Sequence, residues 1–260
     1  MTATAPEAAT ERIARVAASD VLLVALDFDG TLSHTVDEPM SARMIPAARA
    51  ALGALAAAPR THVALVSGRS LADLRVIAEH DDASPWHLAG SHGIEYWHPG
   101  ESGVEGAPTS EETATLDQLA DTAEGLVADL DGAWIERKSF GFGVHTRLSE
   151  PDAAATAQRR VDDLVAREAP AWRRRTGHDI VEYAFREGGK DDAVRRLADR
   201  VGATAVVFAG DDVTDEDALR ALGPADLGVR VGAGETAAAV RVGSPEELAA
   251  LLQHLADARG

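Results

Sequence analysis

The most informative segment of the chain is VLLVALDFDGT, at Val21–Thr31. It opens with a continuously apolar run of about six residues that includes β-branched members, a pattern typical of a strand buried on both faces of a parallel sheet. Two later segments have the same design: HVALVSGR at His62–Arg69 and AVVFAGDDVTDED at Ala205–Asp217. In open α/β sheets, the carboxyl ends of the parallel strands border one crevice. We therefore expect the polar residues after these strands to converge there, namely Asp27, Asp29, Ser67, Asp211, Asp212 and Asp215.

The composition limits the architecture. Of the 260 residues, 45% are hydrophobic but only 4% are aromatic, so the core is built mainly from Ala, Val and Leu. This suits helices packed on a sheet. The chain has no cysteine, which excludes disulfides and thiolate metal sites and fits a reducing compartment.

Charge and hydropathy limit the partners. The formal net charge of −18 argues against nucleic acid and anionic membranes, which are bound largely through Lys and Arg. The amino terminus lacks the basic start and apolar centre of a signal peptide, and no apolar run approaches the ~18 residues that span a bilayer. We therefore expect a cytoplasmic protein. An anionic small molecule would need local neutralisation by a metal ion, a lysine or helix amino termini.

The order of predicted elements indicates an α/β fold, a Rossmann-like parallel-sheet core with an inserted α+β unit. Residues 1–20 are expected to form a tail and one helix, 21–99 and 186–260 the core, and 100–185 the insertion. After about Pro99 the chain is rich in Gly, Pro, Ser and Glu, and the pattern changes to helix, hairpin, helix, hairpin. The second hairpin is expected to turn at Gly177-His178. A final helix is predicted with Ser244 as N-cap and Glu247 completing a capping box.

The pair Asp27 and Asp29 carries the first chemical signal. A carboxylate at a strand end, beside a metal and a loop that binds phosphate oxygens, can attack phosphorus and form an aspartyl-phosphate. Asp29 is then placed to protonate the leaving oxygen and later to take a proton from water. The alternative is an ordinary turn or N-cap pair, which the position after a buried strand disfavours.

The segment GDDVTDE supplies three more carboxylates. Oxygen ligands without His or Cys favour a Mg²⁺-like ion, which takes few protein carboxylates. We predict that Asp211 binds it together with the Asp27 carboxylate and the Asp29 carbonyl. Asp212 and Asp215 are water-bridged or supporting candidates. Taken alone, such an acidic loop is often only a solvated turn.

Two further segments can neutralise a phosphate. Ser67, Gly68 and Arg69 place a hydroxyl, backbone N–H groups and a cation at a predicted helix start. Lys190 opens the helix after Gly188-Gly189, where its ammonium can lie between the phosphate and Asp27. A loop with an N-cap and a surface lysine are the ordinary alternatives.

Together, these motifs resemble a known superfamily. DFDGTL, Ser67, Lys190 and GDDVTDE, in this order and with an insertion between the second and third, resemble the Mg²⁺-dependent phosphatases of the haloacid-dehalogenase superfamily with an α/β cap. Within it, the pieces SGRS, AGSHGIE and ERKSFGFGVHTR are most similar to trehalose-6-phosphate phosphatases. The resemblance covers the chain from about Val21 to the end.

The resemblance implies substrate-binding residues in both parts of the chain. They are Gly30, Thr31, Gly68, Arg69 and His92 in the core, and Glu136, Lys138, His145, Arg147 and Glu182 in the cap. Thr146 stands where the family usually has Tyr, a departure that bears on substrate choice. From the residues alone, the cap positions also fit a solvated sheet face with paired charges. Trp134, Trp172, Phe140 and Phe142 are interpreted as packing residues.

The function that the resemblance implies is Mg²⁺-dependent hydrolysis of trehalose 6-phosphate, the last step of trehalose biosynthesis, in functional pairing with a trehalose-6-phosphate synthase. One alternative is another sugar-phosphate phosphatase or a phosphomutase. A second alternative, of a different class, is a silent sugar-phosphate-binding partner of a trehalose synthase. The presence of Asp27, Asp29 and Asp211 argues against the silent form.

Overall fold

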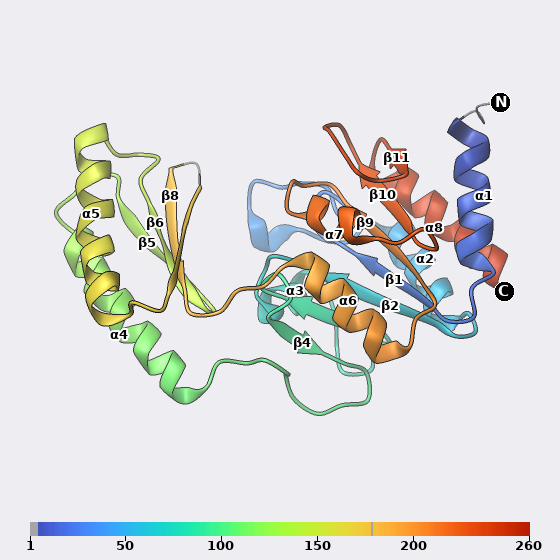
Figure 1. The fold of residues 1–260 in the computed structure, drawn as a ribbon, viewed down its shortest axis with the longest axis horizontal. Helices are drawn as coiled ribbons and strands as arrows, with labels where there is room; N and C mark the ends of the chain where they lie inside the picture. The colour runs from blue at the N-terminus through green and yellow to red at the C-terminus, as the bar shows by residue number, and fades with distance from the viewer. Residues whose placement is uncertain (1–4, 178) are drawn as a thin grey trace. The chain divides into compact units, whose positions relative to one another are not determined.

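The computed structural model describes residues 5–177 and 179–260 and divides into two compact units. The first comprises the chain up to Glu105 together with Gly188–Gly260, and the second is Gly106–Glu187. The sequence pattern predicts these boundaries after residues 99 and 185. Each unit has its own hydrophobic core, and Figure 1 traces the chain through both units.

The first unit is built on a seven-stranded sheet with strand order β11-β10-β9-β1-β2-β3-β4. All neighbouring strands are parallel except β3 and β4. This confirms the predicted α/β fold. The strands are β1 (Leu22–Leu26), β2 (Thr61–Val66), β3 (His87–Gly90), β4 (Glu95–Trp97), β9 (Ala205–Gly210), β10 (Leu227–Val231) and β11 (Val240–Val242).

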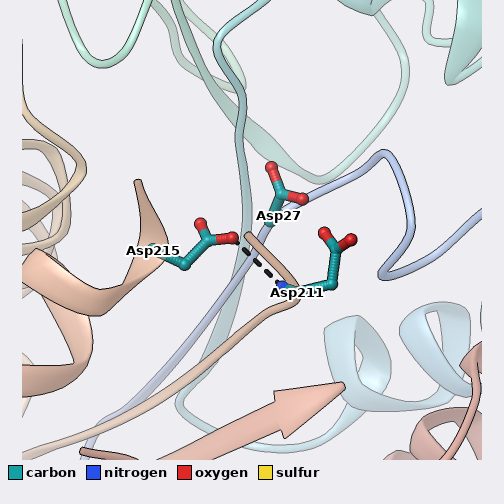
Figure 2. Close-up of side chains that lie close together, drawn as sticks. All are labelled: Asp27, Asp211 and Asp215. Carbon is teal, nitrogen blue, oxygen red and sulfur yellow. Dashed lines mark hydrogen bonds between the residues drawn. The ribbon is translucent and has the colours of Figure 1, made fainter. Parts of the chain in front are cut away.

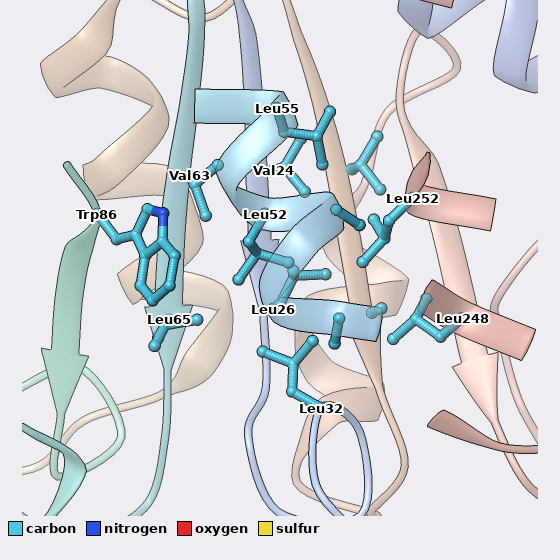
Figure 3. Close-up of a cluster of buried hydrophobic side chains, with 14 of the residues drawn as sticks. Val24, Leu26, Leu32, Leu52, Leu55, Val63, Leu65, Trp86, Leu248 and Leu252 are labelled. Atoms are coloured by element: carbon cyan, nitrogen blue, oxygen red, sulfur yellow. The ribbon is translucent and has the colours of Figure 1, made fainter. Parts of the chain in front are cut away.

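Helices cover both faces of this sheet, which explains why β1 is apolar at every position. Leu22, Val24 and Leu26 pack into the core that contains α2 and α8, whereas Leu23 and Ala25 pack into the core that contains α6 and α7. Figure 3 shows the first core, where Leu52 and Leu55 of α2 lie among side chains of the sheet and of α8. The helices of this unit are α1 (Ala5–Ala17), α2 (Pro46–Ala57), α3 (Leu71–Ile77), α6 (Lys190–Val201), α7 (Asp215–Ala221) and α8 (Pro245–Arg259), with a short 3₁₀ turn at Pro39–Ser41.

The second unit packs two helices on one face of an antiparallel sheet with strand order β5-β6-β8-β7. Phe142, Val144, Val181 and Tyr183 alternate toward the helices and are buried with them. The elements are α4 (Ser110–Val127), β5 (Trp134–Lys138), β6 (Gly141–His145), α5 (Pro151–Glu168), β7 (Arg173–Thr176) and β8 (Ile180–Ala184). The expected turn at Gly177-His178 includes His178, which lies outside the described residues.

Two local expectations need correction. The carboxylate of Glu247 accepts the N–H of Gly243 and not that of Ser244, so the predicted capping box is wrong although Ser244 does cap α8. The segment SLADLRVIAEH predicts a helix over residues 70–80, but α3 ends at Ile77, because Glu79 adopts a left-handed φ of 49°. No helix within residues 5–177 and 179–260 has the length and apolarity needed to cross a membrane.

Candidate active site

Three carboxylates meet beyond the ends of β1 and β9, two neighbouring central strands. Asp27 directly follows β1, Asp211 directly follows β9, and Asp215 opens α7 one turn later. Their ligand oxygens all lie within 4.8 Å of one another. Figure 2 shows these side chains gathered at the strand ends, with the N–H of Asp211 bonded to Asp215. The convergence follows from the parallel pairing of β1 with β9, which brings both carboxyl ends to one edge.

Lys190 is the cation that pairs with two of these carboxylates. It is the first residue of α6 and is 4% exposed, and its Nζ lies 2.6 Å from Asp27 Oδ1 and 2.6 Å from Asp215 Oδ1. Burial alone would lower the pKa of Lys190, but Asp27 and Asp215 outweigh it and hold that pKa above its ordinary value. The ammonium therefore stays charged and fixes the Asp27 carboxylate.

Asp215 organises the loop that carries Asp211. Its Oδ2 accepts the N–H of Asp211 at 3.1 Å and that of Asp212 at 2.9 Å. A Cβ on Gly210 would lie 2.2 Å from Asp215 Cγ, so the close approach of this carboxylate to the backbone requires glycine there. Both oxygens of Asp215 thus accept from an ammonium or from backbone N–H groups, whereas Asp27 Oδ2 and Asp211 Oδ1 share the single Thr31 hydroxyl.

The loop after β1 completes the cluster. The Thr31 hydroxyl lies 3.2 Å from Asp27 Oδ2 and 3.2 Å from Asp211 Oδ1, and the residue is fully buried. Gly30 has a φ of +73°, and a Cβ on it would lie 2.1 Å from Asp211 Oδ2. Residues 30 and 31 therefore shape the space in which the two carboxylates face each other.

The electrostatics of the cluster fit a divalent cation. Burial raises the pKa of Asp27 to about 7, with Asp215 and Asp211 adding to the rise and Lys190 opposing it. Burial and Asp215 also raise the pKa of Asp211. Three carboxylates share one ammonium, so negative charge is in excess, and a cation would lower these pKa values. An all-oxygen donor set of this kind suits Mg²⁺ or a similar hard ion.

Asp29 faces a different partner. Its carboxylate accepts two bonds from Arg69, with Nε to Oδ2 and Nη2 to Oδ1 both at 2.6 Å. This bidentate pair joins the loop after β1 to the loop after β2. Ser67, also in the second loop, is 2% exposed and accepts the N–H of Arg69 through its hydroxyl.

Two predicted residues take other positions. The Asp212 side chain is exposed and accepts the N–H of Val213, and it is not among the three clustered carboxylates. The His92 ring lies against Gly68, because a Cβ on that glycine would be 2.6 Å from His92 Cε1. The roles predicted for Asp212, for His92 and for the Asp29 carbonyl therefore stay predictions.

The structure also contains a buried ion pair that sequence reasoning missed. Arg230 of β10 and Glu216 of α7 lie within 3.4 Å of each other, beside the loop of Asp211. An arginine inside the buried strand Leu227–Val231 was the available signal, because an unpaired charge is not expected there.

In the second unit, the predicted sugar-binding residues share the face of the sheet that turns away from α4 and α5. Glu136, Gly143 and Glu182 are cross-strand neighbours on that face. His145 Nε2 donates to Glu136 at 2.8 Å, and Lys138 pairs with Glu182. Burial would raise the pKa of Glu136, but the contacts with His145 and Lys138 outweigh this effect and hold that pKa below its usual range.

Trp134 lies on this same face and is not buried in the core of the unit. Its ring stacks on His145 with centroids 4.6 Å apart, and Arg147 lies 5.5 Å above it. Trp134 therefore packs on polar neighbours of this face, whereas Phe142 lies in the hydrophobic core and Trp172 packs against it.

Comparisons with known proteins agree with this arrangement. Residues 25–250 match the family described as trehalose-phosphatase. The chain is 35% identical over 259 residues to a trehalose-phosphate phosphatase of Mycobacterium avium, covering 90% of this chain and 62% of that protein. It is also 35% identical over 257 residues to a Mycobacterium tuberculosis protein described as an uncharacterized glycosyl hydrolase, covering 90% of this chain and 18% of that protein. The chain thus spans less than two thirds of either relative.

Among solved structures, trehalose-6-phosphate phosphatase of Aspergillus fumigatus has a TM-score of 0.73 at 23% identity, covering 96% of this chain and 97% of that one. A parallel sheet with carboxylates at its central strand ends and an inserted α+β unit defines a haloacid-dehalogenase-like fold with a cap. Since the family match spans most of its length, the chain belongs to the trehalose-phosphatase family.

Proposed function

We propose that this chain hydrolyses trehalose 6-phosphate to trehalose and inorganic phosphate. The observation that carries the proposal is the Asp27 carboxylate, fixed by Lys190 at the end of β1 within a cluster of three acidic side chains. Family membership supports the substrate. The reaction would be the last step of trehalose biosynthesis, performed in the cytoplasm on the product of a trehalose-6-phosphate synthase.

The reaction would proceed in two displacements. An Asp27 oxygen bonds to phosphorus while the bond from phosphorus to the sugar oxygen breaks, and Asp29 gives that oxygen a proton. Water then attacks the aspartyl-phosphate, Asp29 takes a proton from it, and the bond to Asp27 breaks. For this role Asp29 has to release Arg69 and take up a proton from solvent before it contacts the leaving oxygen.

Several groups would stabilise the transferring phosphoryl group. Lys190 contributes a fixed positive charge, and Ser67 with the N–H groups around Gly68 and Arg69 contributes hydrogen-bond donors. A bound Mg²⁺, held by Asp27, Asp211 and the Asp29 carbonyl, would neutralise charge on the phosphoryl oxygens. Asp215 would keep its two N–H contacts and so hold Asp211 in place.

The cap face would recognise the sugar. Glu136, His145, Lys138 and Glu182 present alternating acceptors and donors, and Gly143 lies between Glu136 and Glu182 with the Ile180 side chain against it. A sugar hydroxyl both donates and accepts, so it can bridge such pairs. A purely solvated face would use the same ion pairs without any preference for a disaccharide.

The test is Mg²⁺-dependent phosphate release from trehalose 6-phosphate by the parent and by Asp27→Asn. This variant keeps the shape and removes the nucleophilic charge, so activity should fall about 10³-fold or more. Equal release by both proteins would exclude Asp27 as the nucleophile.

A substrate panel then separates the alternatives. We expect kcat/KM to be highest for trehalose 6-phosphate when it is compared with the 6-phosphates of glucose, mannose and sucrose. Glu136→Ala should reduce disaccharide turnover more than turnover of a small phosphate ester. A flat panel would exclude the disaccharide specificity, and transfer of phosphate to a second sugar position would indicate a mutase.

A further inference from the structure

The ion pair of Arg230 and Glu216 lies outside the acidic cluster. Arg230 is 7% exposed in an otherwise apolar strand, and Glu216 is 4% exposed on the buried side of α7. Burying two charges costs several kcal/mol per ion, and apolar side chains often replace such pairs without loss of stability. Stability alone therefore does not account for this pair.

The guanidinium of Arg230 donates to backbone carbonyls on both sides of it. Nη1 donates to the carbonyl of Asp212 at 2.8 Å, and Nε and Nη2 donate to the carbonyl of Ala233 at 3.3 and 3.1 Å. Glu216 accepts the N–H of Ala237 at 2.9 Å. The pair thus joins the loop after β9 to the segment after β10.

Asp212 is consequently held at both of its backbone groups. Its N–H donates to Asp215 Oδ2, and its carbonyl accepts from Arg230 Nη1. Asp211 directly precedes it, so the direction of the Asp211 carboxylate depends on these two contacts. Asp215 contacts this loop from the acidic cluster, and Arg230 contacts it from strand β10.

We propose that Arg230 and Glu216 are positioning residues for the metal site, which fix the loop of residues 210–215 so that Asp211 presents its oxygens to the cation. The inference rests on the metal requirement of the proposed function. Outer contacts that orient metal ligands typically change metal affinity about 10- to 100-fold.

The test is a Mn²⁺ binding isotherm of the substrate-free protein, measured by titration calorimetry and by electron paramagnetic resonance. The double variant R230M/E216Q replaces the pair with neutral side chains, and its glutamine keeps an acceptor for the Ala237 N–H. We expect its dissociation constant to rise about 10-fold or more, while kcat at saturating metal stays close to that of the parent.

The matched control is Arg241→Met. Arg241 is exposed and donates to the carbonyls of Gly232 and Gly234, in the same segment after β10 that Arg230 contacts. It does not contact the loop of Asp211. Its Mn²⁺ affinity should equal that of the parent. If the double variant does not fold, Arg230→Lys decides, because it keeps the charge and loses the fork that reaches both carbonyls.

The outcomes separate the two proposals. A parent that binds no Mn²⁺ overturns the metal requirement and the positioning role together. A parent that binds, with a double variant that binds equally well, overturns the positioning role alone. If Arg241→Met weakens Mn²⁺ binding as much as the double variant does, the effect comes from a general loosening of the segment after β10. This result would also overturn the positioning role.

Discussion

At the scale of single residues, the use of lysine is distinctive. Of the 25 Lys and Arg residues, only Lys138 and Lys190 are lysines, and both belong to the predicted site. An ammonium is a compact charge that accommodates two carboxylates in a small space, whereas a guanidinium is a wide planar fork. Lys190 between Asp27 and Asp215 has this geometry.

This composition makes an amine-selective reagent informative. The Lys138 side chain is 42% exposed and that of Lys190 is 4% exposed, so acetylation should modify Lys138 first. We expect turnover of trehalose 6-phosphate to fall in step with that modification, and turnover of a small phosphate ester to persist. Peptide mapping measures the modification of each lysine, and activity assays measure the turnover of each substrate. In Lys138→Arg, which resists the reagent, activity should no longer fall, and early modification of Lys190 would contradict the described burial.

Gly30 allows a second prediction at this scale. In Gly30→Ala the new Cβ meets Asp211 and also takes a positive φ, so both metal binding and stability should fall. Gly202→Ala is the control, because it has a φ of +65° with no atom within 4 Å of the new Cβ. The positive φ should cost each variant about 1 kcal/mol in unfolding free energy, measured with urea, and Gly30→Ala should lose more because its Cβ also clashes with Asp211. Only Gly30→Ala should weaken Mn²⁺ binding, and an equal affinity in both variants would contradict the proximity argument.

At the scale of elements, the edge of the sheet formed by β3 and β4 contains a buried histidine pair. His87 Nδ1 and His98 Nδ1 are 3.0 Å apart, and His98 Nε2 lies 3.3 Å from Glu105. If His98 donates to Glu105, its Nδ1 accepts from His87, which accounts for both contacts with neutral rings. Burial, with His98 and His62 adding to its effect, lowers the pKa of His87 to about 4.

This pair predicts a loss of stability in mild acid. The unfolded chain takes up a proton at His87 near pH 6.5 and the folded chain only near pH 4, so stability present above pH 6.5 declines as the pH falls through that interval. The loss is at most about 3 kcal/mol, measurable by urea unfolding at pH 7.5 and 5. His87→Asn should flatten this dependence, whereas replacing the exposed His254 should not. An unchanged slope in His87→Asn would exclude the histidine as its source.

The elements differ in how far the sequence predicts them. Strands β1, β2 and β9 follow from their continuous apolar runs, which only burial on both faces explains. Strand β11 was missed because Val240–Val242 is too short to display a periodicity. The capping box was misassigned because Glu247 is equally able to reach Gly243, and sequence does not rank two N–H groups one residue apart.

The candidate site likewise contains residues that the sequence predicts and contacts that it does not. Asp27, Asp211 and Asp215 could be grouped from sequence, because each follows a recognisable strand and parallel strands share an edge. The bidentate contact of Arg69 with Asp29 could not be predicted, since it depends on the paths of two loops. The partner of Arg230 is likewise defined only by how β10 packs beside α7.

At the scale of the whole molecule, the two units have separate cores but the acidic cluster belongs to one of them. A ligand that binds only the folded state stabilises it by RT ln(1 + [L]/Kd), or about 2.7 kcal/mol at 100 times Kd. Metal binding should therefore act on the unit that contains the cluster.

Hydrogen exchange followed by mass spectrometry checks this expectation. Added Mg²⁺ should slow exchange in peptides that cover β1, β9 and the start of α7, and should leave peptides of α4, β6 and β8 unchanged. Asp211→Asn with the same Mg²⁺ is the control, and its exchange should match that of the metal-free parent. Equal protection of both units would mean that they open together.

The strand order has a consequence for how the chain is made. Strand β1 lies between β2 and β9, and β9 is synthesised only after the whole inserted unit has been synthesised. Until then one edge of β1 has no neighbour, while the insertion is contiguous and holds every residue of its own core. The inserted unit can thus complete its core before the sheet does, and Asp27 acquires its neighbours Lys190, Asp211 and Asp215 only when the last part of the chain is made.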